Sequence, residues 1–274
     1  MSFKDILVYL DDGASNTERV NTAFTLAKTY QARLTGVTPA AIKPAHLKVS
    51  DEKAVANISE QEAFNRLAEF KRLAEADAIS VDIRIIHGNE SMVSRKLAQI
   101  ARNFDLVMLR QANPENKNFS MVETIAEQVL LLSGRPIFFM PYIGAHRIPC
   151  KKALIAWDGS PAVTRSIHGI LPLLERVDKV IILVVKGKKK TAKGELLADD
   201  LVSHLKRHNV NAKIKRVSAG TFDVPTVILN HIAENDIDLL VMGGYGTPSL
   251  KQKIFGGVTQ TLLSSMIVPV IMSH

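Results

Sequence analysis

The chain has 274 residues, 46% of them hydrophobic and 23% charged, which is ordinary for a globular protein and excludes the disordered and fibrous classes. No run of about 20 apolar residues spans a membrane, and the first residues turn acidic before a signal peptide develops, so we expect a cytoplasmic protein without membrane contact. The net charge of +8 is uneven: residues 148–274 carry 17 basic and 10 acidic side chains, which favours an anionic ligand or partner.

Short apolar runs alternate with helical patterns along the whole chain. The predicted elements of the first half are a strand over 3–10, a helix over 15–30, a strand over 33–38, a helix over 51–77, a strand over 80–87, a helix over 90–103, a strand over 105–110, a helix over 120–132 and a strand over 136–140. The same order repeats from residue 152. Near-continuous apolar strands, such as 179–185, are typical of a parallel sheet covered on both faces.

The two halves are copies of one unit. The apolar run Ile6–Leu10, followed by Asp11, recurs 147 residues later as Ala153–Trp157, followed by Asp158, and two later strands recur with an offset of 133. The sequence therefore predicts an α/β protein with two tandem doubly wound domains, each an open five-stranded parallel sheet with helices on both faces. The predicted boundaries are 1–143 for the first domain, 144–151 for a linker and 152–274 for the second domain.

Glycines surround the loop that follows the fourth strand of the second copy. Residues without Cβ atoms allow the backbone to approach a ligand closely, and the unpaired N–H groups of the next helix can bind phosphate. The glycines are Gly243, Gly244, Gly246, Gly256 and Gly257, and their ungapped counterparts in the first copy are Arg110, Gln111, Asn113, Glu123 and Thr124. We infer that the fold does not require these glycines and that the first copy is a degenerate site, in which Glu123 would repel phosphate.

Three segments resemble the universal stress protein family: Ile6-Leu-Val with Asp12-Gly13, the run 153–161, and Gly243-x2-Gly246-x9-Gly256. The resemblance covers nearly the whole chain, as two tandem domains. It implies that ATP binds in the second domain, with Mg²⁺ as a candidate companion ion. By this resemblance Asp158, Val185 and Met242 border the adenine and ribose, and Gly243, Gly246, Gly256, Gly257 and Val258 hold the ribose and phosphates through backbone groups.

One position departs from the family pattern. Gly257 stands where the family has Ser or Thr, and Thr259, two residues on, is the nearest hydroxyl. The resemblance also implies a regulatory role in stress physiology, pairing of the two domains through their last strands as a pseudo-dimer, and a further homodimer.

Two other functions stay open. A scaffold that binds no nucleotide, or that binds a small metabolite, fits the missing hydroxyl at Gly257. A slow ATPase is the second alternative, although no Walker Lys-Ser/Thr follows the loop, so we predict at most weak hydrolysis and name no catalytic residue.

Two further patterns are interpreted as surface features. His204 and His208 have the i, i+4 spacing of a zinc clamp but lack a third ligand in the sequence, so no metal site is predicted. The lysine-rich segment 186–193 has no aromatic residue for base stacking, so we expect no specific nucleic-acid binding.

Overall fold

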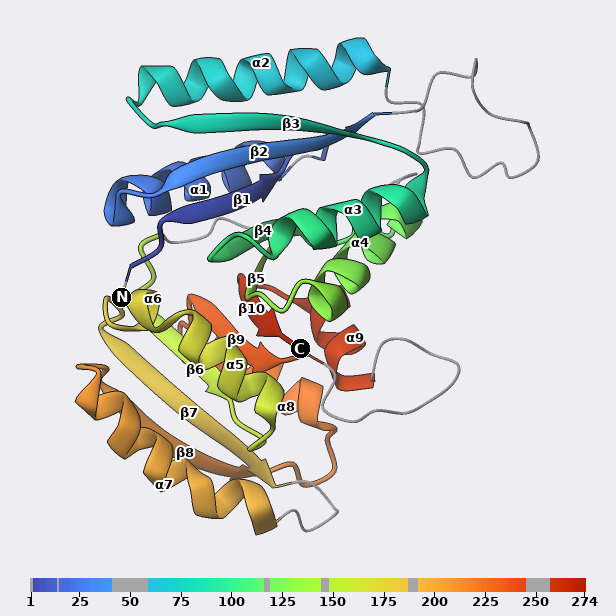
Figure 1. The fold of residues 1–274 in the computed structure, drawn as a ribbon. Helices are drawn as coiled ribbons and strands as arrows, with labels where there is room; N and C mark the ends of the chain where they lie inside the picture. Colours follow the sequence, from blue (N-terminus) through green and yellow to red (C-terminus); the bar gives the residue numbers. More distant parts are fainter. Residues whose placement is uncertain are drawn as a thin grey trace. The chain divides into compact units, whose positions relative to one another are not determined.

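The structure is a computed structural model, and it describes residues 2–13, 15–40, 59–115, 119–143, 148–186, 192–244 and 257–274. The chain divides into two compact units, Ser2–Tyr142 and Ile143–His274. Both units have the α/β fold, with helices packed against a parallel sheet (Figure 1).

The first unit has a five-stranded parallel sheet in the order β3-β2-β1-β4-β5. Helix α2 packs on β2 and β3, α1 packs on β1 and β4, and α3 packs against α4. The elements are β1 (Asp5–Tyr9), α1 (Asn16–Tyr30), β2 (Arg33–Ala40), α2 (Glu60–Ala76), β3 (Val81–His87), α3 (Glu90–Ala101), β4 (Leu106–Arg110), α4 (Phe119–Leu132) and β5 (Ile137–Met140).

The second unit repeats this order as β8-β7-β6-β9-β10, again with parallel pairs. Helix α5 packs on β9 and β10, α7 packs on β7 and β8, and α8 contacts α9. The elements are β6 (Lys152–Ala156), α5 (Pro161–Gly169), α6 (Leu171–Leu174), β7 (Lys179–Lys186), α7 (Ala192–Arg207), β8 (Ala212–Ser218), α8 (Val224–Glu234), β9 (Leu239–Gly243), α9 (Gly257–Ser265) and β10 (Val270–Ser273).

The strand registers confirm the two offsets read from the sequence. In the first unit Ile6 is in register with Leu106, and in the second Ala153 is in register with Leu239. The hydrogen bond from the N–H of Leu10 to the Val37 carbonyl is matched by the one from Trp157 to Leu183. The central strands of both sheets are buried along most of their length, as their apolar runs predict.

Two predicted boundaries were wrong. Helix α2 begins at Glu60, because Ser59 and Glu62 form a reciprocal capping box; residues 41–58, which include the predicted start at 51, lie outside the described part. Strand β2 continues to Ala40 through Pro39. Its register with β1 ends at Val37, so Pro39 neighbours β3 on one side alone, where a missing N–H is tolerated.

Candidate functional site

Both sheets have a point at which the strand order reverses, between β1 and β4 in the first unit and between β6 and β9 in the second. In open α/β sheets ligands bind beyond the carboxyl ends of the strands at this point. In the second unit Asp158 follows β6, Val185 lies near the end of β7, and Met242 and Gly243 end β9. The structure therefore brings these residues to one edge of three neighbouring strands. Gly246 and Gly256 lie outside the described residues.

Asp158 is exposed and its orientation is set by a tight turn. Its Oδ1 accepts a hydrogen bond from the Ser160 N–H at 2.9 Å. Ser160 then caps α5, since its Oγ accepts from the N–H of Val163 at 3.3 Å, and Pro161 occupies the first helical position. Because Ser160 caps α5 and also donates its N–H to Asp158, the start of this helix fixes the position of the Asp158 carboxylate at the carboxyl end of β6.

Met242 is buried and its carbonyl is already hydrogen bonded. The Ser166 hydroxyl donates to this carbonyl at 2.7 Å, and Ser166 Oγ accepts from the N–H of Ser273, also at 2.7 Å. One fully buried hydroxyl on α5 therefore ties the ends of β9 and β10 together. Sequence reasoning missed Ser166, because a lone serine in a helix has no motif; its only signal was a polar residue on the apolar face of α5.

Gly243 is required by packing. A Cβ at this position would lie 2.7 Å from the backbone nitrogen of Val163 and 3.0 Å from Ala162 Cβ. The inference that the fold needs none of the loop glycines is therefore wrong for Gly243. The first unit tolerates Arg110 there because its turn is longer: α1 starts at Asn16, five residues after Asp11, whereas α5 starts three residues after Asp158.

The N-terminus of α9 is open. Gly257 and Val258 are exposed, and among the described residues no non-neighbouring atom lies within 4 Å of the place where a Cβ on Gly257 would stand. The first N–H groups of a helix lack partners within the helix and attract anions. Thr259, in contrast, is 4% exposed, so its side chain is largely covered by the protein. Its role at the ligand stays a prediction.

His204 on α7 and His208, just after its end, have a neighbour that the sequence did not reveal. The ring of His204 packs in a tilted arrangement against those of His208 and of His168 on α5, with ring centroids 4.7 and 5.0 Å apart. Burial lowers the pKa of His204, and the nearby His168, His208 and Arg207 lower it further. Within the described ranges, no three His, Cys, Asp or Glu side chains are arranged to hold a metal ion.

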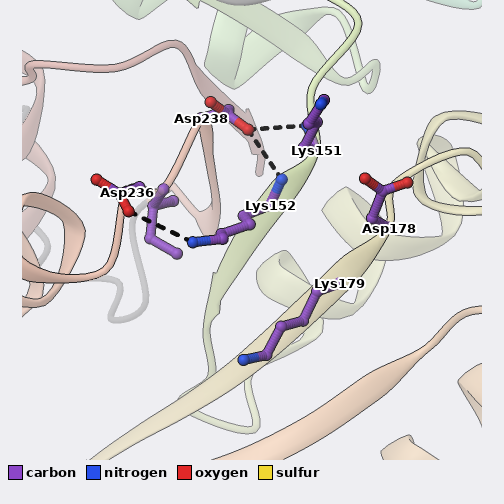
Figure 2. Close-up of a pocket in the computed structure, with 7 residues that line it drawn as sticks. Lys151, Lys152, Asp178, Lys179, Asp236 and Asp238 are labelled. Atoms are coloured by element: carbon purple, nitrogen blue, oxygen red, sulfur yellow. Dashed lines mark hydrogen bonds and ion pairs between the residues drawn. The ribbon is translucent and has the colours of Figure 1, made fainter.

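A pocket of about 480 Å³ lies at the opposite edge of the second sheet, where the strands begin (Figure 2). Asp238 Oδ2 accepts from the backbone N–H groups of Lys151 and Lys152, at 2.8 and 2.9 Å, and the Lys152 ammonium lies 3.5 Å from Asp236. Asp238 thus pairs with the backbone, and Lys152 pairs with Asp236. The pocket is distant from the carboxyl ends and is not the predicted ligand site.

The fold and the arrangement of these residues define a tandem α/β protein whose candidate ligand residues gather at the carboxyl ends of β6, β7 and β9. The universal stress protein family model matches residues 150–274. The second domain therefore belongs to the universal stress protein family, and the chain as a whole has the fold of tandem universal stress proteins. No curated protein sequence matched the chain.

Solved structures of similar fold cover both halves. A universal stress protein from Archaeoglobus fulgidus is 14% identical, with a TM-score of 0.65 over 97% of this chain and 94% of that one. One from Pseudomonas aeruginosa is 15% identical, with a TM-score of 0.62 over 98% and 92%. The cytoplasmic domain of a prokaryotic cation chloride cotransporter is 10% identical, with a TM-score of 0.55 over 98% and 94%. At these identities the likeness concerns the fold.

In the part of the chain that the structure describes, no helix has both the length and the hydropathy needed to cross a bilayer.

Proposed function

We propose that the second domain binds an adenine nucleotide, ATP, at the carboxyl ends of β6, β7 and β9. The observation that carries this proposal is the N-terminus of α9, where Gly257 is exposed and a Cβ on it would meet no non-neighbouring atom of the described residues within 4 Å. The helix dipole and the unpaired N–H groups there favour phosphate. The exposed carboxylate of Asp158, after the neighbouring strand β6, is available to hydroxyl or amino groups of a nucleoside.

The glycine pattern and the family of the second domain support the same ligand. Asp158, Val185 and Met242 would border the adenine and ribose, with backbone groups of Gly243 and Val258 nearer the phosphates. Gly246 and Gly256 complete the sequence pattern, and Mg²⁺ would accompany the triphosphate. The excess of basic residues in 148–274 raises the local concentration of such anions.

The role that fits this site is regulatory binding. No Walker lysine and hydroxyl pair follows the glycines, so efficient phosphoryl transfer lacks its usual groups. Occupancy of the site would then bias an interaction with another protein. A cytoplasmic location, pairing of the domains through their last strands and a further homodimer stay predictions.

The test begins with protein purified without a tag, which is denatured so that any released nucleotide can be identified. ATP is then titrated calorimetrically into the wild type, Gly257→Glu and Gly257→Ala. The glutamate has room and suits a helix N-terminus, so the domain stays folded while its charge repels phosphate. We expect at least about a tenfold loss of affinity for Gly257→Glu and less than about a twofold change for the alanine control.

The same titration separates the alternatives. No released nucleotide and no binding heat from folded wild-type protein would refute the proposal and favour the scaffold. Binding that Gly257→Glu leaves unchanged would place the anion elsewhere. Phosphate release above that of Gly257→Glu, measured with Mg²⁺, would instead favour the slow ATPase.

A further inference from the structure

The crevice of the first domain holds charged side chains at positions equivalent to those of the second. The Gly13 N–H donates to Asp11 Oδ1 at 2.9 Å, as the Ser160 N–H does to Asp158. Arg110 ends β4 in register with Met140, which is the place that Gly243 has opposite Ser273 in the second domain. The two crevices can therefore be compared position by position.

Arg110 crosses the crevice of the first domain. Its Nε lies 2.6 Å from Asp11 Oδ2, and the two side chains are only 3% and 5% exposed. A Cβ placed on Gly13 would lie 3.0 Å from Arg110 Nη1, so the guanidinium packs directly over the backbone of the turn that follows β1. The side chain thus reaches from the end of β4 to the end of β1, the two strands between which the order reverses.

A second arginine completes the ion cluster. Arg19 on α1 is fully buried; its Nη2 lies 3.2 Å from Asp11 Oδ1, and its Nε donates to the Tyr9 carbonyl at 2.8 Å. Burial alone would raise the pKa of Asp11, but the charges of Arg19 and Arg110 and the Gly13 N–H outweigh it and hold this pKa below its usual value. Both carboxylate oxygens are therefore engaged by the protein itself.

The second domain differs at each of these points. Asp158 is exposed rather than buried, and in the described part of the domain its carboxylate accepts one hydrogen bond, from Ser160. Gly243 projects no side chain toward it. Arginine side chains pair with the aspartate in the first domain, whereas no cation of the described part of the second domain pairs with Asp158.

We propose that Arg110 is the residue that excludes a ligand from the first domain, because its guanidinium occupies the place beside Asp11, and no described side chain of the second domain pairs with Asp158 in the same way. A ligand entering there would have to break a buried ion pair and leave a carboxylate without its partner, which is strongly unfavourable. The carboxyl ends of β1 and β4 in the first domain would therefore hold no nucleotide. This inference rests on the function proposed for the second domain for its choice of ATP as the probe.

The test uses two variants that differ at Arg110 alone. One carries Asn113→Gly and Glu123→Gly, which restore the glycine spacing and leave Thr124 as the following hydroxyl. The other adds Arg110→Gly. Equilibrium dialysis counts ATP bound per folded chain, and we expect one for the first variant and two for the second. Equal counts would overturn the proposal. If the second domain binds no ATP, the expected counts become zero and one, so the two proposals fail separately.

Amide hydrogen exchange covers the case in which Arg110→Gly unfolds the first domain. In wild-type protein with saturating ATP, we expect no added protection in residues 9–19 or 106–113. Protection of the Gly13 or Gln111 amides by ATP would show that the first crevice admits the nucleotide with Arg110 in place, and would overturn the proposal.

Discussion

Gly257→Ser adds one hydroxyl at the first residue of α9. In the part of the chain that the structure describes, the added Cβ meets no atom within 4 Å, so we expect no displacement of the backbone. Serine is also a slightly better helix residue than glycine, so the domain should not lose stability. The hydroxyl stands at the exposed start of the helix, where the proposed phosphates bind.

The gain in affinity follows from one added hydrogen bond. A hydrogen bond to a charged group contributes about 1.5–3 kcal/mol, and the lower end applies at an exposed position, which corresponds to about tenfold tighter ATP binding. Calorimetric titration with ATP measures it, and adenosine is the control, because it lacks the phosphates and should bind equally to both proteins. An unchanged ATP affinity, or an equal gain for adenosine, would refute the placement of phosphate at α9.

Further predictions concern stability. Asp11→Asn should destabilise the first domain by about 3–5 kcal/mol, because two buried arginines lose their charged partner. The control Asp158→Asn, at an exposed position, should cost less than about 1 kcal/mol. Denaturant unfolding measures both losses of stability, and equal losses would contradict the buried ion cluster. Because the pKa of Asp11 is lowered in the folded protein, its contribution to the free energy of unfolding is present above the unfolded pKa of about 4 and is lost as pH falls through the lower folded value. Asp11→Asn should therefore flatten the acid side of the plot of stability against pH. An unchanged slope would count against the ion pairs. Ser166→Ala should cost about 1–3 kcal/mol by removing a buried hydrogen-bond partner of the Met242 carbonyl and of the Ser273 N–H, with exposed Ser203→Ala as the control and thermal unfolding as the measurement.

The repeat and the sheet topology could be predicted because they depend on local patterns. Apolar runs and their spacing fix which strands correspond, and the observed registers of Ile6 and Ala153 match the offsets from the sequence. Helix starts were predictable where a cap was visible, as at Ser160 before Pro161. The start of α2 was missed because the helical composition continues upstream of its cap at Ser59.

The contacts within the sites depend on three-dimensional packing and could not be predicted. The sequence shows that Arg110 replaces a glycine, but not that its guanidinium turns inward to Asp11. The close approach of α5 to Gly243 depends on a difference of two residues in the preceding turn. His168 joins His204 from a helix far away in the sequence, a contact that no spacing rule contains.

The carboxylates at the starts of the fourth strands have a consequence for how such a chain can change. Asp105 Oδ2 accepts from the N–H groups of Lys4 and Asp5, as Asp238 does from Lys151 and Lys152, so both domains close their amino edge with the same device. The turns at the carboxyl edge take no part in these hydrogen bonds. They can therefore be exchanged while the contacts at the amino edge of the sheet stay intact. After a duplication, an arginine could thus fill the ligand position of one copy without disturbing the fold of that copy. Because the carboxyl-edge turns are separate from the contacts at the amino edge, they are also suitable units for engineering.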